Sequence, residues 1–182
     1  PSFIKIIGPS AFSSSLINSI LIHSQITHIF DEAFLFCKKL KRIEIPINSE
    51  LKMIDDYAFS NSSIKSITIP NHVVYIGKYC FSNCDKLQKV EIPTNSELEI
   101  FDSYAFHSTP IESIRIPSNL VVIEDNTFKE CKKLTHVDIP INSKLKKIGE
   151  FTFSDSKIER LFIPSGLVEL REGWCGKVLH LN

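Results

Sequence analysis

The chain carries an internal repeat, marked by proline, that runs through most of its length. An Ile-Pro dipeptide occurs six times, and successive copies are separated alternately by 24 and 23 residues. The copies are Ile45-Pro46, Ile69-Pro70, Ile92-Pro93, Ile116-Pro117, Ile139-Pro140 and Ile163-Pro164. Units of this size cannot bury a hydrophobic face alone, so they must stack into an elongated array. The repeat therefore predicts a function carried by a surface rather than by a deep pocket.

A second marker, a small residue followed by Phe, divides the repeat into a longer and a shorter unit. Its spacing alternates between 22 and 25 residues, so both markers share a double period of 47 residues. The Phe residues are Phe12, Phe34, Phe59, Phe81, Phe106, Phe128 and Phe153. Like positions in stacked extended units lie about 4.8 Å apart. The seven Phe side chains are therefore predicted to form one internal ladder.

Each unit contains two short apolar patterns that predict extended chain. The first is Ile-x-Ile-Pro, in which alternating β-branched residues indicate a strand and the Pro, which lacks an N–H group, ends it. The second is an apolar pair with a spacing of three, such as Leu51 and Ile54. About 23 residues per turn leave no room for a full helix beside two extended segments and two corners. The corner at each Ala-Phe pair has room for a single turn of 3₁₀ helix.

Two segments carry a resemblance to a known family. Residues 87–93 are Leu-Gln-Lys-Val-Glu-Ile-Pro, and residues 73–84 are Val-Val-Tyr-Ile-Gly-Lys-Tyr-Cys-Phe-Ser-Asn-Cys. These sequences resemble the BspA-like class of leucine-rich repeats, whose units combine Leu-x-x-Ile-x-Ile-Pro, a Val-x-x-Ile-Gly-like segment and Ala-Phe-x-x-Cys-x-x-Leu. The resemblance extends from about Phe3 to Gly173. Within the repeats, the Gly that follows Ile is present only at Gly77 and Gly149, with Gly8 as a further candidate.

The resemblance implies both an architecture and a setting. It implies a β-rich solenoid, a right-handed leucine-rich repeat coil with a parallel β-sheet and short extended or 3₁₀ segments on its back. Members of this class are surface antigens of bacteria and of mucosal protozoan parasites, and their proposed role is adhesion to host matrix or to other cells. For this chain the resemblance therefore implies a repeat protein that binds other proteins at a cell surface.

We expect one solenoid domain over residues 1–173, of about seven to eight turns, followed by a C-terminal cap over residues 174–182. Trp174 stands where the preceding units have Ala, Cys or Thr, and its volume does not fit that small position. The solenoid is therefore expected to stop there, with Val178, Leu179 and Leu181 folding over its last turn. Because the chain begins partway through a unit, we interpret it as part of a longer array.

Charge and hydropathy argue against two classes of partner. Lys plus Arg and Asp plus Glu each number 21, so the formal net charge at pH 7 is zero. Binding to nucleic acid requires an excess of Lys and Arg on one face, which this balance does not favour. No apolar run approaches the roughly 20 residues of a membrane-spanning helix. We therefore expect no nucleic-acid partner, no membrane span in this segment, and a monomer that binds a protein.

The Cys and His residues lack the spacing of a metal or catalytic site. Cys37, Cys84 and Cys131 occupy one position of the longer unit, so they would lie about 9–10 Å apart, too far for a disulfide. We interpret them, together with Cys80, as buried thiols of the core. The six His residues have no ligand spacing, and the six Gly residues form no phosphate-binding loop. The sequence therefore predicts no enzyme, no metal site and no cofactor.

Polar residues flank the central apolar residue of each Ile-x-Ile strand and are expected to point outward from the main sheet, on its concave face. In the longer units they are a base and an acid, and in the shorter units they are mostly hydroxyl residues. This pattern either keeps an exposed sheet soluble, with like charges two turns apart, or forms a partner-binding strip. An aromatic residue beside Arg favours the second interpretation, because binding hot spots have that composition. The candidate residues are Arg42, Glu44, Lys89, Glu91, Arg115, His136, Asp138, Arg160 and Phe162.

The sequence thus predicts a non-enzymatic protein-interaction module. The leading function is cell-surface adhesion or recognition of a host or extracellular-matrix protein, and it follows from the family resemblance. The alternative is a cytoplasmic leucine-rich repeat scaffold that recruits a partner or flanks a catalytic domain outside this segment. If the strip is not the site, the corner loops with Lys38-Lys39, Lys86 and Lys132-Lys133 are the next candidate.

Overall fold

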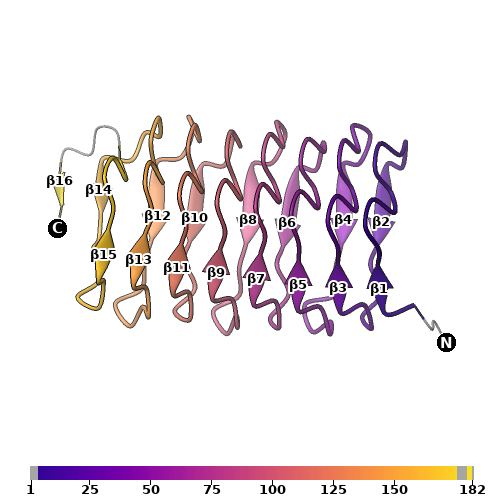
Figure 1. Ribbon diagram of the computed structural model, residues 1–182, viewed down its shortest axis with the longest axis horizontal. Coiled ribbons are helices and arrows are strands. Elements are labelled where there is room, and N and C mark those ends of the chain that lie inside the picture. The colour runs from indigo at the N-terminus through magenta and orange to yellow at the C-terminus, as the bar shows by residue number, and fades with distance from the viewer. Residues whose placement is uncertain (1–3, 176–179, 182) are drawn as a thin grey trace.

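The chain folds into an elongated parallel β-solenoid whose turns stack in sequence order, as Figure 1 shows. The computed structural model describes residues 4–175 and 180–181, and the secondary structure within them consists of strands, turns and bends without a helix. Every turn has two short extended segments, as the sequence predicted. They are joined by a corner at the small-Phe pair, here called the Phe corner, and by a corner that follows the Ile-x-Ile strand, here called the Pro corner.

One face of the solenoid is a continuous sheet of eight parallel strands. Its order is β1-β3-β5-β7-β9-β11-β13-β15, so each strand pairs with the strands of the turns before and after it. In the register, Ile54 pairs with Ile29 on one side and with Ile76 on the other. The strands are β1 (Ile6–Ile7), β3 (His28–Ile29), β5 (Met53–Ile54), β7 (Tyr75–Ile76), β9 (Ile100–Phe101), β11 (Val122–Ile123), β13 (Lys147–Ile148) and β15 (Glu169–Leu170).

The opposite face carries the Ile-x-Ile strands, and these pair two by two. The pairs are β2 with β4, β6 with β8, β10 with β12, and β14 with β16. The strands are β2 (Ser19–Leu21), β4 (Arg42–Glu44), β6 (Ser66–Thr68), β8 (Lys89–Glu91), β10 (Ser113–Arg115), β12 (His136–Asp138), β14 (Arg160–Leu161) and β16 (His180–Leu181).

The expectation that the Ile-x-Ile strands form the main sheet is therefore wrong. The continuous ladder lies in the second extended segment, and the Ile-x-Ile face is interrupted after every second strand. Hydrogen bonds at the approach to these strands differ accordingly. The Gln88 N–H donates to the Lys65 carbonyl over 2.9 Å ahead of the paired strands β6 and β8, whereas the Lys65 N–H is 3.4 Å from the Lys41 carbonyl ahead of β4 and β6.

The predicted Phe ladder forms the core of the solenoid. Adjacent rings from Phe12 to Phe153 stack with centroids 5.0 to 5.5 Å apart and with planes within 10° of parallel. The six rings from Phe34 onward have at most 1% of their surface exposed. Since stacked aromatic rings gain more than their buried area alone provides, the ladder both fills the core and fixes the register of the turns.

The Phe corner consists of turns instead of the 3₁₀ helix that the sequence allowed. The Leu35 N–H donates to the Glu32 carbonyl of its own turn over 2.9 Å, but the Phe34 N–H donates to Ala58 of the next turn over 2.7 Å. Glu32 and Phe36 adopt positive φ angles of 58° and 56°. A 3₁₀ helix would keep each amide bonded within its own turn. The left-handed residues instead leave alternate amides free to join the turns.

The four cysteines that the sequence assigned to the core are free thiols, as predicted. Cys37, Cys80, Cys84 and Cys131 are buried, and Cys175 is partly buried. In the longer units each thiol donates to the carbonyl of the ladder Phe of the preceding turn, and the sulfur of Cys37 lies 3.0 Å from the Phe12 oxygen. The cysteines therefore link successive turns by hydrogen bonds and not by disulfides.

At the C-terminal end the backbone ladder of the Phe corner continues through Trp174. The Phe153 N–H donates to the Trp174 carbonyl over 2.7 Å, just as the Phe34 N–H donates to Ala58. The Trp174 ring, however, meets Phe153 edge to face at 85° and 6.5 Å instead of extending the parallel stack. The side chains of Val178, Leu179 and Leu181, which were expected to cap the last turn, lie outside the described residues. The division into a solenoid and a cap thus stays a prediction.

Candidate functional site

The outward side chains of the Ile-x-Ile face form regular ion pairs at the N-terminal end of the array. Arg42 Nε lies 2.7 Å from Glu44 Oε1 within β4, and Lys89 Nζ lies 2.5 Å from Glu91 Oε1 within β8. The Lys89 ammonium and the Thr68 hydroxyl hold the pKa of the Glu91 carboxyl below its ordinary value. All four charged side chains are more than half exposed, so these pairs contribute little to stability.

The regular pattern ends at β10. Arg115 has no acid in its own strand, and its Nε lies 3.4 Å from Asp138 Oδ2 on the neighbouring strand β12. The register places Arg115 directly beside Asp138 and Ser113 beside His136. The pairing therefore changes from within a strand to between strands, and it connects the outward residues of two turns.

Beside Asp138 the surface forms a shallow hollow of about 580 Å³. Predicted site residues His136, Asp138 and Arg160 line it together with Thr135, Val137, Lys157 and Glu159. Arg160 forms no ion pair with any described residue, because Phe162 stands where the longer units have an acid. Phe162 follows β14 and is 40% exposed, although it does not line the hollow. We call Arg115, His136, Asp138, Arg160 and Phe162 the strand-face strip.

The structure thus brings some of the predicted residues together and leaves others apart. His136, Asp138 and Arg160 line the hollow, and Arg115 lies on the preceding turn beside Asp138. The Arg42–Glu44 and Lys89–Glu91 pairs lie further toward the N-terminal end. Sequence reasoning missed Thr135, Lys157 and Glu159. Each stands one to three residues before an outward strand residue, where the chain approaches the strand from the Phe corner, and this position could have indicated them.

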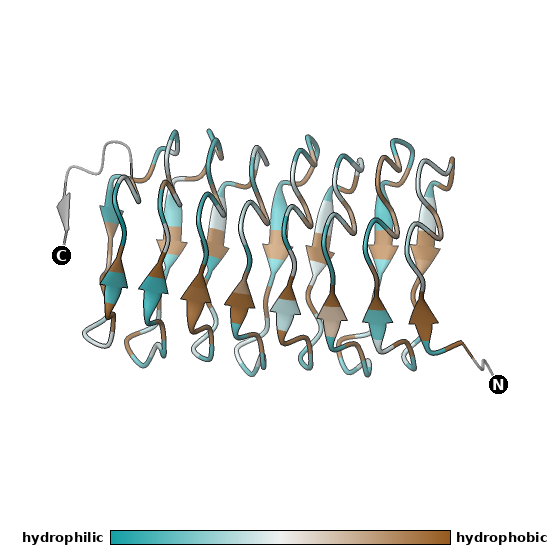
Figure 2. Cartoon of the chain, in the orientation of Figure 1, coloured by the Kyte–Doolittle hydropathy of each residue, from teal (hydrophilic) through white to brown (hydrophobic). Residues whose placement is uncertain are grey.

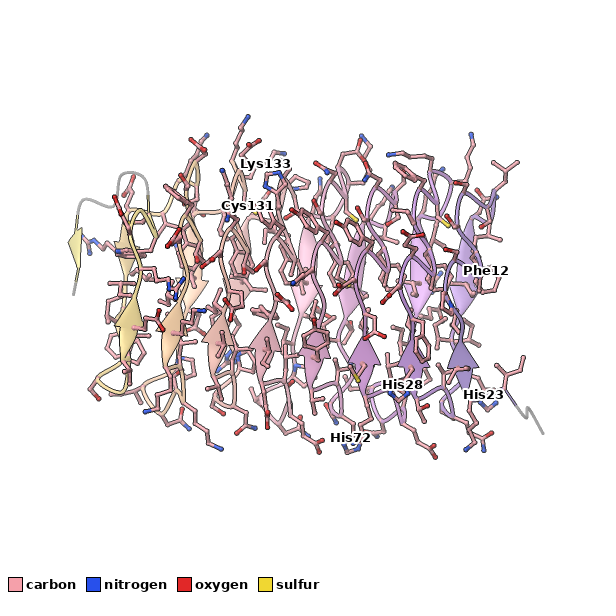
Figure 3. The ribbon with its side chains drawn as sticks, in the orientation of Figure 1. Phe12, His23, His28, His72, Cys131 and Lys133 are labelled. Carbon is pink, nitrogen blue, oxygen red and sulfur yellow. The ribbon has the colours of Figure 1, made fainter. Side chains whose placement is uncertain are left out.

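The described residues hold no group of three or more His, Cys, Asp or Glu side chains that could bind a metal ion. Figure 3 shows that the labelled His23 and His28 lie near the N-terminal end of the array, five residues apart in one turn, and that His72 lies further along it. Burial raises the pKa of the Cys84 and Cys131 thiols to about 11, so these thiols stay protonated near neutral pH. The arrangement of polar side chains on the strand-face strip is suited to contacts with a polar partner surface.

The repeat and the stacked corners match a known family. A family model described as the BspA type Leucine rich repeat region matches residues 1–66 and 52–174, with six copies. The chain belongs to the BspA-type leucine-rich repeat family. The predicted family and the predicted solenoid are therefore both confirmed.

Solved structures of leucine-rich repeat proteins resemble this BspA-type solenoid. One from Bacteroides ovatus is 28% identical with a TM-score of 0.62, over 90% of this chain and 48% of that protein. One from T. pallidum is 26% identical with a TM-score of 0.73, over 84% of this chain and 70% of that protein. A leucine rich cell surface protein from Faecalibacterium prausnitzii is 20% identical with a TM-score of 0.58, over 91% of this chain and 60% of that protein. The chain spans about half the length of the B. ovatus protein.

No curated protein matches this BspA-type chain. Within the described residues, no helix has the length and apolar character needed to span a membrane.

Proposed function

We propose that the chain is a non-enzymatic protein-interaction module that acts in adhesion at a cell surface. Membership of the BspA-type leucine-rich repeat family supports the interaction role, since stacked repeats present extended surfaces for binding. The cell-surface location is supported by the similar fold of the F. prausnitzii protein, which is described as a leucine rich cell surface protein. The partner is a host or extracellular-matrix protein.

We assign the partner contact to the strand-face strip. The observation that carries this assignment is Arg160, which has no ion-pair partner among the described residues and borders the hollow of about 580 Å³. An unpaired guanidinium can bind a carboxylate of a partner through two parallel hydrogen bonds. Phe162 adds an exposed aromatic side chain two residues along, and Arg with an aromatic residue is the usual composition of a hot spot. With no net charge, the attraction must come from local complementarity.

Replacing Arg160 and Phe162 together by Ser tests this assignment. The readout is binding of the purified protein to immobilised collagen, laminin and fibronectin. Affinity for the partner in this panel should fall by about 30-fold, equivalent to roughly 2 kcal/mol, if the pair acts as a hot spot. Thermal stability should stay unchanged, because both side chains point away from the core.

A matched control removes one base and one apolar residue from the opposite face. Lys146→Ser with Val168→Ser meets this need, since both residues are exposed at the edge of the continuous sheet. The control should bind like the unaltered protein. Equal affinity of the Arg160 and Phe162 variant, with unaltered folding, would move the site to the lysine-bearing corner loops. Absence of surface labelling when intact cells are treated with an impermeant amine reagent would favour the cytoplasmic scaffold.

A further inference from the structure

A second hollow, of about 500 Å³, runs along the Phe corners of successive turns. The same five-residue pattern, Tyr-x-Phe-Ser-Asn, builds it twice, at residues 57–61 and 79–83. Tyr104 extends one wall into the next turn, and Glu32 with Phe36 closes the opposite end. We call this hollow the tyrosine groove. It lies at the corners and not on the Ile-x-Ile face, so it is separate from the strand-face strip.

One wall of the groove is a row of three tyrosines. The rings of Tyr57 and Tyr79 stack at 4.9 Å, and those of Tyr79 and Tyr104 stack at 4.6 Å. Their hydroxyl groups hydrogen-bond to no other described residue, so the row presents three open donor and acceptor groups. The fold does not require tyrosine here, because Ser10 and Asn126 occupy the same corner position in other turns, also at positive φ.

The other wall and the floor present amides and hydroxyls. Asn61 Nδ2 donates to Ser60 Oγ over 3.1 Å, and Asn83 Nδ2 donates to Ser82 Oγ over 3.3 Å. Each amide group is thereby oriented, and the side-chain carbonyl of each Asn remains available as an acceptor. Ser60 and Ser82 are almost fully buried, at 3% and 1% exposure, so they form a fixed floor. The groove therefore offers unbonded Tyr hydroxyls and Asn side-chain carbonyls along one hollow.

The charges of the lining residues and the hydrogen bonds of the corner backbone limit the class of ligand that the groove can bind. Neither Lys nor Arg lines the groove, and a described cation is at its end, where Lys38 Nζ lies 5.8 Å from the centre of the Phe36 ring, so an anionic ligand finds no counter-charge along its length. Glu32 is the one acidic lining residue, and it stands at the end. The backbone amides of the corner are already hydrogen-bonded. The Tyr79 N–H donates to the backbone carbonyl of Ser103 over 3.1 Å, and the Asn83 N–H donates to the backbone carbonyl of His107 over 2.9 Å. An extended peptide therefore finds no free backbone ladder to join.

We propose that the tyrosine groove binds a neutral oligosaccharide. Such a ligand carries many hydroxyl groups that both donate and accept, as the Tyr hydroxyls and the Asn carbonyls require. Its apolar ring faces can pack on the most exposed aromatic side chains of the groove, Phe36 at 47% and Tyr57 at 38% exposure. The repeat of the Tyr-x-Phe-Ser-Asn pattern on neighbouring turns suits a ligand that is itself a repeating chain.

The probes are cellohexaose, chitohexaose and maltohexaose, with heparin hexasaccharide as an anionic comparison. Binding is measured by calorimetry and by tyrosine difference absorbance. At least one neutral hexasaccharide should bind saturably and perturb the tyrosine spectrum. Asn83→Gly removes the amide while Gly tolerates the positive φ of 55°, and Tyr79→Phe removes one hydroxyl. Each variant should weaken binding at least fivefold. The fold accepts Phe at this corner position, because Phe151 occupies it with a φ of 52°.

Asp155→Gly is the matched control, since Asp155 occupies the position of Asn83 in a turn outside the groove, with a φ of 61°. It should bind the hexasaccharide as well as the unaltered protein does, with a similar melting temperature. The proposal is overturned if no neutral hexasaccharide binds, or if Asn83→Gly and Tyr79→Phe bind undiminished. Binding of heparin alone, or of extended peptides competing at the same residues, would also overturn it. None of these outcomes bears on the strand-face strip.

Discussion

The thiol of Cys84 donates a hydrogen bond to the backbone carbonyl of Phe59, one turn earlier, over 3.0 Å. The hydroxyl of Ser62 lies 3.4 Å from the same sulfur atom. Two turns further on, Cys131 repeats this contact with Phe106 over 3.2 Å. The recurring Cys of the longer unit is therefore a hydrogen-bonding core residue that ties each long turn to the preceding short one.

The buried thiols predict a loss of stability at alkaline pH. Burial raises the pKa of Cys84 and Cys131 from 9.0 to about 11. Above pH 9.0 the thiols ionise in the unfolded chain before they ionise in the folded chain, so their contribution is complete below pH 9.0 and falls as the pH rises toward 11. The stability difference between the protein and a Cys84→Ala, Cys131→Ala variant, measured by urea denaturation, should shrink across this range. A difference that stays constant across this pH range would contradict the assignment of Cys84 and Cys131 as buried thiols.

The free thiols also predict that a reducing agent leaves the melting temperature unchanged.

Truncation of one ladder Phe tests the core. Phe106 is fully buried and stacks on Phe81 and Phe128 at 5.2 and 5.3 Å. Phe106→Ala should lower the free energy of unfolding by about 3–5 kcal/mol, because it removes these contacts and leaves a cavity. Chemical denaturation gives the value, and Phe162→Ala on the exposed face is the control. A loss below about 1 kcal/mol at Phe106 would show that the ladder is not the core.

Gly77 tests how closely successive turns approach. A Cβ atom at this position would lie 2.6 Å from the Asp55 backbone carbon and 2.7 Å from the Asp56 nitrogen. Gly77→Ala should therefore destabilise the protein by about 1–3 kcal/mol in urea denaturation, because backbone must shift to accommodate the methyl group. Gly8 holds the same position in the first described turn, where a Cβ would meet nothing within 4 Å. If Gly8→Ala and Gly77→Ala cost the same, the close approach is not the cause.

The end of the array gives a prediction about association. Deleting residues 174–182 removes the edge-to-face cover that Trp174 provides for Phe153 and exposes the last turn, whose strand edges can pair with another chain. The truncated protein should form oligomers or aggregates in light scattering, whereas we expect the full chain to be monomeric. Trp174→Ala separates the ring from the rest of the segment and should show a weaker form of the same effect. A truncated protein that remains a stable monomer would exclude a capping role.

The hydropathy of the outward residues varies along the continuous sheet. The continuous sheet has brown segments at β1, β9 and β11 and teal segments at β13 and β15, so its outward residues are not uniform along the array (Figure 2). The inward residues of these same strands are regular, and Ile29, Ile54 and Ile123 are fully buried. Sequence periodicity therefore identified most of the inward residues, although Leu170 of β15 is 39% exposed, while the hydropathy of the outward surface changes from turn to turn.

The candidate sites could be predicted only in part. Period-2 alternation showed that Arg115, His136, Asp138 and Arg160 point outward, because alternate residues of a strand face opposite sides. That Arg115 pairs with Asp138 of the next strand, and that Arg160 borders a hollow, depends on side-chain positions in three turns at once. The Tyr-x-Phe-Ser-Asn pattern was visible in the sequence. Its meaning was not, because the pattern alone does not show that the Tyr and Asn side chains of neighbouring turns line one hollow.

The sequence by itself determined the stack: a repeat of 22 and 25 residues places Phe above Phe and Cys in every second turn, because only stacking buries units of that size. The tertiary structure alone decided which face carries the continuous sheet and how the corners turn. Both extended segments have an apolar pattern that suits a strand, so the pattern cannot choose between them. The choice depends on whether backbone N–H and C=O groups of adjacent turns meet at bonding distance, as they do throughout the eight-stranded sheet.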